Sequence, residues 1–588
     1  MTKNYNSRAK RVTVDYLKTA GLQALPHILD VPYRCLRYFW VLVTVGLFVA
    51  LVIHTSMLVH RYVSRPIQVS IKLVHEDSLD FPAVTVCNQN PIPRRLLTPE
   101  ITKEYASLAT LEHSIRCSAI NYLNYSKLGS NILRARYNTS TEQCKTGSNQ
   151  TGNRNDGQQL KSLFSSDVPD LSDIQHFLQP DYERIYTRSG FNNLEHLARF
   201  VRQCSYNAAA CNYSDDFSIL YNKRYGRCFT FASVVGQSFK QKSKSKIDDE
   251  PKQNQNGCQG QRKDCNKNEL VARKTTELAG SEYGLRLTIN IDPDEYVGIL
   301  ASAYGARVVI HDSRLVPHPH SSGINIPVGM LSSIAVKTQR IVRLPAPYES
   351  SCMQKVPSEY YSHFRSGDEN FTTYSYQGCM NLCRNNQLLK MCNCTAALSY
   401  YDGSETSKFK VCNFLDSKER SCIGQLRQLL ESLRNSAHGQ IQIDTALNST
   451  KSTLTRCHCE NACNETSFIY SVSAAQWPSL QFANVILNNF HNVSPSLWQD
   501  LNKDGIWIDR EQPGTVSKSL LRIHVYLEDL NYHMISESPE YDLANLLADF
   551  GGILGLYLGL SLASIFECVQ YLGFLACFRS SDTFPSEM

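Results

Sequence analysis

Two long apolar runs stand out from an otherwise mixed chain of 588 residues. The first covers residues 38–59 and has no charged side chain, whereas the second covers residues 543–578 and has only two, Asp549 and Glu567. A helix needs about 20 apolar residues to cross a bilayer, so both runs are long enough. The pattern predicts two transmembrane helices, over 38–60 and 541–578, with most of the chain between them.

The second run has the features of a pore-lining helix. Asp549 and Glu567 are 18 residues apart, so on a straight helix of 3.6 residues per turn they share one face, about 27 Å apart. Charges at membrane depth are costly and seldom face lipid. Small residues spaced by four let helices approach closely, and this run contains Gly551, Gly555 and Gly559. The glycines alone fit simple helix packing, but two carboxylates that bracket residues 559–561 favour a conduction path.

Shorter patterns predict a β-rich domain with some helices between the two runs. Residues 284–291 alternate apolar and polar positions, as a strand with one buried face does. A charged helix is expected over 422–434, and residues 240–267 are expected to form a solvated loop closed by Cys258 and Cys265. We expect strands over 84–86, 227–231, 284–291, 306–310, 332–344 and 520–527. The predicted fold class is an α+β membrane protein with two spans and a large domain between them.

The distribution of charge predicts the topology. Residues 1–37 carry seven Lys or Arg side chains against two Asp, and such an excess marks a cytosolic segment. Two spans then place residues 61–540 outside the cell and return the tail, 579–588, to the cytosol. The first run is too long for a cleavable signal peptide. The net charge of +6 is spread along the whole chain, which argues against nucleic acid as a partner.

Glycosylation motifs and cysteines agree with an extracellular domain. Of 21 cysteines, 18 lie between Cys87 and Cys463, which fits disulfides in an oxidising compartment. The Cys and His residues at 379–394 and 457–463 are also a candidate zinc site. Sequons within these clusters place them outside the cell, which favours disulfides over zinc. The predicted glycosylation sites are Asn124, Asn138, Asn149, Asn212, Asn370, Asn393, Asn448, Asn464 and Asn492. No catalytic constellation is evident, so we expect neither an enzyme nor a cofactor nor a metal.

Several stretches, in the right order along nearly the whole chain, carry a resemblance to a known family. They are FPAVTVCN at 81–88, RYGRCFTF at 224–231, LPAPY at 344–348, the cysteine-rich block 352–463, LNY at 530–532 and the apolar run that contains 559–561. With these residues the chain resembles the degenerin/epithelial sodium channel superfamily, which includes acid-sensing and peptide-gated channels.

The resemblance implies a trimeric sodium-selective channel at the plasma membrane, with palm, β-ball, finger, knuckle and thumb regions outside the cell. It places the selectivity filter at Gly559, Leu560 and Ser561. It places the gate-sensitive degenerin position at Ala548, beside the pore acids Asp549 and Glu567. It also assigns the coupling between ectodomain and pore to Tyr62 and Tyr348. For Glu567, contact with ions and a hydrogen bond between subunits stay open.

Finer features point to a subtype. The motif around Ser471, Ser473 and 477–479 looks like the epithelial, degenerin and peptide-gated members more than the acid-sensing ones. The length of 588 residues, the short tail and the segment 204–231 look like invertebrate FMRFamide-gated sodium channels. The chain departs from the family at Gln23 and Ala24, where a His-Gly pair is usual. We therefore expect an amiloride-sensitive homotrimer in membrane lipid that conducts Na⁺ and opens on binding an amidated neuropeptide. The alternative within the superfamily is a proton-gated or constitutively open channel.

Two other classes share some of these features. A two-span nucleotide-gated channel would need a rigid cluster of extracellular lysines, whereas the lysines here gather in the low-complexity segment 240–267. A non-conducting glycoprotein receptor would share the sequons and disulfides, but it does not require paired carboxylates within the membrane. Both classes fit the sequence less well than a sodium channel.

Overall fold

The computed structural model describes part of the chain. The described residues are 28, 32–97, 182–189, 192–235, 274–354 without 299, 356, 360, 373–395, 400–401, 410, 412, 417–435, 440–444, 451–486 without 484, 514–561, and 563–573 without 565 and 568. They belong to two compact units. The helical unit comprises 1–71, 343–351 and 536–588, and the sheet unit comprises 72–342 and 352–535.

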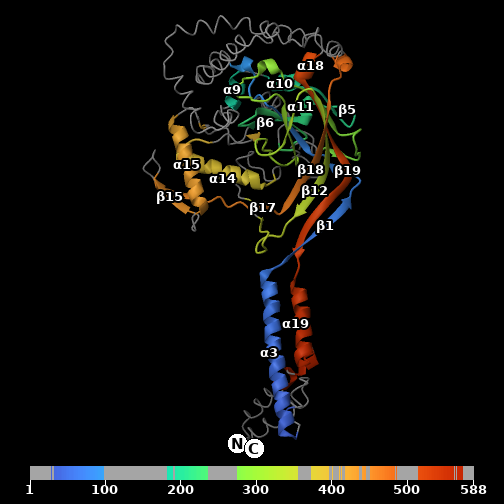
Figure 1. The fold of residues 1–588 in the computed structure, drawn as a ribbon, viewed down its shortest axis with the longest axis vertical. Coiled ribbons are helices and arrows are strands. Elements are labelled where there is room, and N and C mark those ends of the chain that lie inside the picture. Colours follow the sequence, from blue (N-terminus) through green and yellow to red (C-terminus); the bar gives the residue numbers. More distant parts are fainter. Residues whose placement is uncertain are drawn as a thin grey trace, which may run out of the picture. The chain divides into compact units, whose positions relative to one another are not determined.

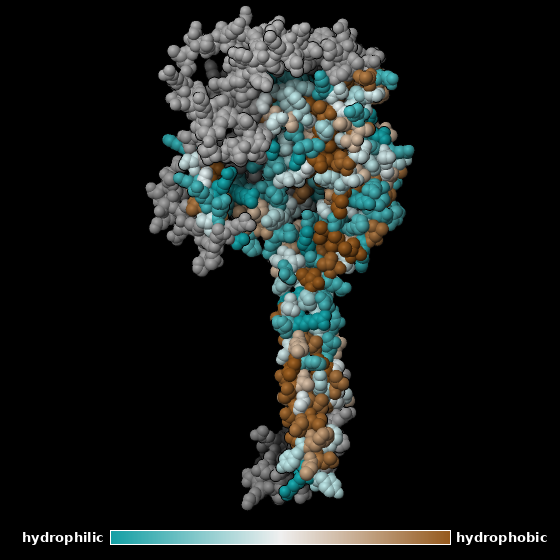
Figure 2. Space-filling model, in the orientation of Figure 1, coloured by the Kyte–Doolittle hydropathy of each residue, from teal (hydrophilic) through white to brown (hydrophobic). Residues whose placement is uncertain are grey.

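The helical unit is built around two helices that lie side by side, α3 (Arg34–Ser64) and α19 (Leu543–Leu558) (Figure 1). Within the described residues, α3 is the one helix long and apolar enough to cross a membrane. Large apolar side chains such as Leu42, Phe48 and Leu556 are exposed on these helices, and Figure 2 shows hydrophobic residues along both of them. This exposure is expected for surfaces that face lipid or another helix.

The run 543–578 does not form one straight helix. α19 ends at Leu558, and Gly559 takes a left-handed conformation with φ of 67°. Helical residues resume at 563. The two carboxylates therefore lie on separate helical segments, and the shared face with a separation of about 27 Å no longer applies.

The larger sheet of the sheet unit is antiparallel wherever its register is defined. Its longest ladder pairs β12 with β18, from Met330 opposite Gln476 to Val342 opposite Asn464. Two of its strands, β1 and β19, continue into the helical unit. In the described residues the order is β18 (Asn464–Gln476), β12 (Met330–Val342), β19 (Leu520–Pro539), β9 (Leu285–Asn290), β4 (Val201–Tyr206) and β5 (Ala209–Ala210), with β1 (Ile67–His75) paired to β19.

A second sheet and several short ladders complete the β-structure. Within the described residues the second sheet runs β11 (Ile324–Ile326), β10 (Ala306–His311), β3 (Ala83–Asn88), β7 (Gly226–Phe231), β6 (Phe217–Asn222) and β14 (Tyr400–Tyr401). The short pairs are β13 (Cys352–Met353) with β17 (Asn461–Ala462), β15 (Gln440–Asp444) with β16 (Lys451–Thr455), and β2 (Leu79–Asp80) with β8 (Thr275–Thr276).

The core lies between the two sheets. Leu285, Leu287 and Ile289 of β9 are fully buried and join one cluster with Val86 of β3 and Phe231 of β7. The period of two seen in the sequence therefore marks the buried face of β9, as expected. The strands predicted at 84–86, 227–231, 284–291, 306–310 and 332–344 are confirmed, while the one predicted at 520–527 is the first part of a longer strand.

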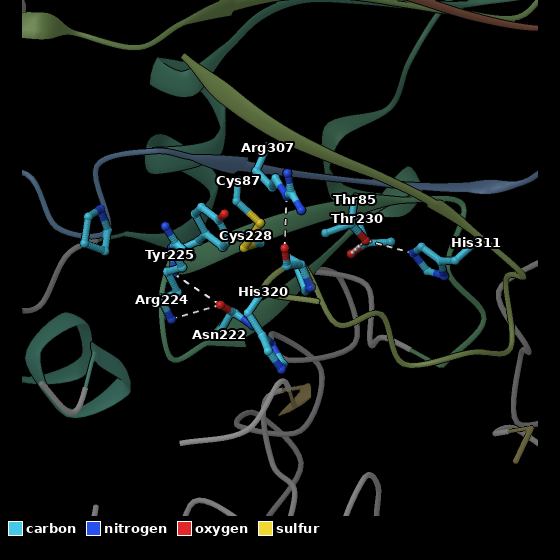
Figure 3. The surroundings of a disulfide bond; sticks show 12 residues. Thr85, Cys87, Asn222, Arg224, Tyr225, Cys228, Thr230, Arg307, His311 and His320 are labelled. Atoms are coloured by element: carbon cyan, nitrogen blue, oxygen red, sulfur yellow. Dashed lines mark hydrogen bonds between the residues drawn. A yellow bond between two sulfur atoms is a disulfide. The ribbon is translucent and has the colours of Figure 1, made fainter. Parts of the chain in front are cut away.

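A disulfide and a buried polar chain hold the second sheet together (Figure 3). Cys87 of β3 lies directly opposite Cys228 of β7, and the two are bonded. On the same strands the Thr85 hydroxyl lies 2.8 Å from the Thr230 hydroxyl and 2.8 Å from Nε2 of His311. Burial lowers the pKa of His311 to about 4, so the ring stays neutral within this network.

The cysteine clusters form disulfides. Cys379 and Cys383, one turn apart on α14 (Tyr376–Cys392), bond to Cys459 and Cys457. The other pairs in the described residues are Cys352–Cys463, Cys392–Cys422, Cys394–Cys412 and Cys204–Cys211. These bonds tie α14 to α15 (Ser417–Asn435) and to the segment before β18. The prediction of disulfides rather than zinc is confirmed for these cysteines.

Shorter helices complete the described secondary structure: η1 (Arg94–Leu96), α9 (Tyr182–Arg188), α10 (Asn193–Phe200), α11 (Tyr213–Asp216), η3 (Pro293–Glu295) and α18 (Gly514–Ser519). Several predictions fall outside the described residues. They concern Gln23 and Ala24, the loop 240–267, the tail 579–588, and the sequons at Asn124, Asn138, Asn149, Asn370, Asn448 and Asn492.

Candidate functional site: the helix break between two carboxylates

The break after α19 begins with a glycine. Gly559 adopts a conformation that favours glycine over residues with a Cβ. Its N–H donates to the Gly555 carbonyl at 3.0 Å, and the Leu560 N–H donates to the Leu554 carbonyl at 3.3 Å. The carbonyls in the last turn of a helix lack partners from a following turn. The break therefore leaves backbone oxygens of α19 available to another partner.

A serine starts the helical segment that follows. The Ser564 N–H donates to the Ser561 side chain at 3.3 Å and lies 3.0 Å from the Ser561 carbonyl. In return, the Ser561 N–H donates to the Ser564 hydroxyl at 3.3 Å. This reciprocal pattern is that of a capping box, in which a side chain satisfies the first N–H groups of a helix. The Gly-x-Ser sequence thus combines a helix end and a helix start.

Ser564 is a residue of this helix break that the sequence analysis did not single out. It is nearly buried, with 8% of its surface exposed. The available signal was its spacing of three from Ser561, which is the spacing of a capping pair. Leu560 is the residue between the end of one segment and the cap of the next.

The outer carboxylate is held by a hydrogen bond. The Tyr541 hydroxyl donates to Oδ2 of Asp549 at 2.6 Å. The Arg61 guanidinium lies over the Tyr541 ring, 5.1 Å from its centroid, and pairs with Glu540 at 2.8 Å. Charge-assisted hydrogen bonds are roughly twice as strong as neutral ones, so Tyr541 orients Asp549. No sequence pattern indicated this hydrogen bond, because Tyr541 lies before the start of α19 and its direction depends on the local fold.

The other predicted residues of the second run are exposed in the single chain. Ala548 and Glu567 both have solvent-facing side chains. A Cβ added at Gly551 would meet nothing within 4 Å, and one at Gly555 would meet only the Leu560 carbonyl oxygen at 3.8 Å. The glycine seam therefore does not pack against α3. One contact between α19 and α3 is a hydrogen bond of 3.0 Å between the Tyr557 hydroxyl and Nδ1 of His54.

Comparison with known proteins identifies the family. The description "Amiloride-sensitive sodium channel" matches residues 16–571, which includes both apolar runs and everything between them. The chain belongs to the amiloride-sensitive sodium channel family. Members of this family are ion channels rather than enzymes, so the prediction of a degenerin or epithelial-type channel is confirmed at the family level.

Relatives of this family member include degenerins and degenerin-like proteins of nematodes. The chain is 25% identical over 64% of its length to the degenerin-like protein unc-105 of Caenorhabditis elegans, 27% over 65% to the degenerin-like protein asic-1 of the same species, and 27% over 63% to the degenerin mec-4 of Caenorhabditis briggsae. The aligned region spans only 34% to 38% of the length of these three relatives.

Arg65 contacts both Tyr62 and Tyr348, the two tyrosines expected to couple the ectodomain to the pore. Arg65 ends α3, donates its N–H to the Tyr62 carbonyl at 3.3 Å, and places its guanidinium 5.9 Å from the centre of the Tyr348 ring. The coupling role stays a prediction, and Arg65 joins the residues that would carry it.

Three of the predicted glycosylation sites lie in described parts of the sheet unit. Asn212, Asn393 and Asn464 all have exposed side chains. Asn212 also caps α11 by accepting from the Ser214 N–H at 3.1 Å. Exposure is what attachment of a glycan requires.

Proposed function

We propose that three copies of this chain form a sodium-selective, amiloride-sensitive channel in the plasma membrane. The observation that carries the proposal is the helix break at Gly559–Ser561, flanked by Asp549 on one segment and Glu567 on the next. In a bilayer, backbone outside regular helix is tolerated only where it faces protein or a water-filled path. A break at this position between two carboxylates fits a pore.

The proposed chemistry of conduction follows from these groups. Three Asp549 carboxylates would concentrate cations at the outer end, and carbonyls at the break would replace part of the hydration shell of Na⁺. Ser561 would fix the geometry of the break through its bonds to Ser564. Glu567 would either contact ions or form a hydrogen bond between subunits.

Exposed apolar surface supports an assembly of several copies. Val69, Ile71 and Leu73 on β1 are each more than half exposed, and Ile469 and Val472 on β18 are about half exposed. Such contiguous apolar surface on a strand marks a contact site in many proteins. Together with the open faces of Gly551 and Gly555, it supports a homotrimer in which neighbouring copies cover these residues.

Whole-cell recording after expression tests the proposal. We expect a current that amiloride blocks and whose reversal potential follows the sodium gradient more closely than the potassium gradient. A current without sodium selectivity would favour a nucleotide-gated type of channel. Absence of any current under all stimuli, with the protein present at the cell surface, would favour the non-conducting receptor class.

For gating, we infer that the activator is a short extracellular peptide with an amidated end. The subtype resemblance supports this, and so does the state of one acidic pair. Asp216 forms an ion pair with Lys274 at 2.8 Å and accepts the Asn212 N–H, and Asp215 bonds to the Asn212 side chain. These two carboxylates therefore have local partners on their own segment and on Lys274.

The environment of Asp292 supports the alternative gating mode, in which acid opens the channel. Burial, together with the neighbouring Glu295, raises the pKa of Asp292 to about 6. This carboxylate lines a small cavity with Arg95 and Arg202. A group with this pKa changes its charge between neutral and mildly acidic pH.

One experiment separates the two gating modes. FMRFamide-like peptides are applied rapidly at pH 7.4, and acid steps are applied to the same cells. We expect current to the peptides. Current to acid alone, abolished by Asp292→Asn, would establish the proton-gated alternative in its place.

A further inference from the structure

A cavity of about 250 Å³ lies in the sheet unit, between the larger sheet and the residues that lead into α14. Residues 373–376 and 312–315 contribute to its other walls. Its lining includes residues on three neighbouring strands: Arg340, Ile341 and Val342 of β12, Asn464, Glu465 and Thr466 of β18, and Tyr532 and Met534 of β19. Because these strands are neighbours in one sheet, the residues form a continuous patch.

Asn464 lies at the edge of this cavity. It is the first residue of β18, it is exposed, and it pairs in register with Val342. Asn464, Glu465 and Thr466 form a glycosylation sequon. Because Asn464 itself lines the cavity, a sugar attached to it would begin beside the cavity.

The lining suits a sugar ring. Tyr374 and Tyr532 are 8% and 6% exposed and are fixed in place: the Tyr374 hydroxyl donates to the Glu460 carbonyl at 2.7 Å, and the Arg340 guanidinium lies 4.1 Å from the centre of the Tyr532 ring. Aromatic rings offer apolar faces to the C–H groups of a pyranose. The charged rim, Asp312, Arg314 and Glu465, offers partners for its hydroxyl and acetamide groups. An aromatic wall with a few polar groups is the usual composition of a small-molecule site.

We propose that Asn464 carries an N-linked glycan whose first N-acetylglucosamine occupies this cavity and braces the start of α14 against the larger sheet. The modification forms a bond between Nδ2 of Asn464 and C1 of the sugar. The amide loses one proton, and the lipid diphosphate of the lipid-linked oligosaccharide donor leaves. The inference rests on the proposed extracellular placement of residues 61–540 and does not depend on channel activity.

The test uses full-length protein expressed in eukaryotic cells and purified in detergent. Mass spectrometry of the peptide that contains Asn464 measures occupancy, and hydrogen exchange measures protection of the first turn of α14. Asn464→Gln and Thr466→Ala both abolish the sequon, whereas Thr466→Ser retains it. Ser214→Ala is the matched control, because it removes the sequon at Asn212 and leaves the Asn212 cap of α11 in place.

We expect Asn464 to be occupied, and we expect both sequon-abolishing variants to speed exchange in the first turn of α14 by at least about threefold, since local opening sets exchange rates. Thr466→Ser, Ser214→Ala and wild-type protein trimmed by an endoglycosidase to the first sugar should all keep wild-type protection. Retained protection in the trimmed sample assigns the effect to the first sugar.

Three outcomes would overturn the inference. An occupied Asn464 whose removal leaves exchange unchanged means that the glycan points into solvent. Loss of protection in occupied Thr466→Ser means that the Thr466 side chain, not the sugar, supports the wall. If Asn212 is glycosylated and Asn464 is not, no sugar fills the cavity, but the extracellular placement of the domain still holds. If neither asparagine is glycosylated, the extracellular placement is contradicted as well.

Discussion

At the scale of single residues, the direction in which the Asp549 carboxylate points matters as much as its charge. Asp549 carries the charge expected of a pore acid, but Tyr541 determines where that charge lies. Arg61 in turn lies over Tyr541 and pairs with Glu540. The exposed Arg61–Glu540 pair alone adds less than about 1 kcal/mol. Its effect on the pore would come through the ring and hydroxyl of Tyr541.

Two substitutions separate charge from orientation at this site. Asp549→Asn removes the carboxylate and should lower single-channel sodium conductance at low ionic strength by more than about twofold, because the attraction of cations is screened by salt. Tyr541→Phe keeps the charge and removes one hydroxyl, so it should lower that conductance by a smaller factor. Both effects should shrink at high salt. Equal losses in the two variants would show that Tyr541 does more than orient Asp549.

Ala548 tests the packing of the closed pore. A small residue next to Asp549 would allow three helices to meet tightly, and a larger one would disfavour that packing. We expect Ala548→Val to raise the resting current severalfold in the absence of any activator. Leu547→Val, at the neighbouring exposed position, is the control and should leave the resting current unchanged. Unchanged resting current in Ala548→Val would place the gate elsewhere.

At the scale of elements, the break between α19 and the following segment is the decisive feature. A helix end and a helix start occur within three residues, through Gly559 and Ser561. A residue with a Cβ in the left-handed conformation costs on the order of 1 kcal/mol relative to glycine. Loss of a serine cap costs about 1 kcal/mol. Either change is large enough to shift the geometry of the break.

The selectivity for sodium over potassium should depend on the geometry of the helix break. We expect Gly559→Ala and Ser561→Asp to raise potassium permeability relative to sodium, because they change the shape and the charge of the proposed filter. Ser564→Ala should have the same direction with a smaller effect, since it removes half of the reciprocal cap. Gly552→Ala lies in the middle of α19, where an added Cβ meets nothing within 4 Å, and serves as the control. Unchanged permeability ratios in all three filter variants would move the filter to another part of the chain.

At the scale of the whole molecule, buried histidines make stability depend on pH. Burial is the main cause that lowers the pKa of His311 and His318 to about 4 and that of His320 to about 3. The folded state therefore binds fewer protons than the unfolded state between these values and the unfolded value near 6.5. Stability rises with pH through this window and is lost as pH falls through it.

We expect the thermal midpoint of the purified protein to fall as pH is lowered from about 6.5 to 4, with each histidine contributing at most about 3 kcal/mol. Asp292 acts in the opposite direction, because its pKa is raised to about 6 and its ionised form is the less stable one in the fold. Asp292→Asn should therefore steepen the loss of stability in acid, whereas His311→Gln should reduce it. A midpoint that is constant from pH 7 to 5 would contradict the buried, neutral state of these rings.

Several elements could be predicted from patterns among residues that are neighbours along the chain. The alternation of apolar residues at 284–291 identified the buried strand β9, the charge-free run at 38–59 identified α3, and the glycine at 559 indicated where a helix could break. The family also followed from local motifs, since the family match covers residues 16–571. Each of these features depends on residues that are neighbours along the chain.

Other contacts could not be predicted from the chain and became evident only in the folded protein. The pairing of Cys379 with Cys459 and of Cys383 with Cys457, the bond from Tyr541 to Asp549, and the cavity beside Asn464 all depend on packing. Several cysteines permit many pairings, and composition does not distinguish among them. A hydropathy pattern reports polarity but not backbone direction. The left-handed turn at Gly559 changes that direction without changing the polarity of the run.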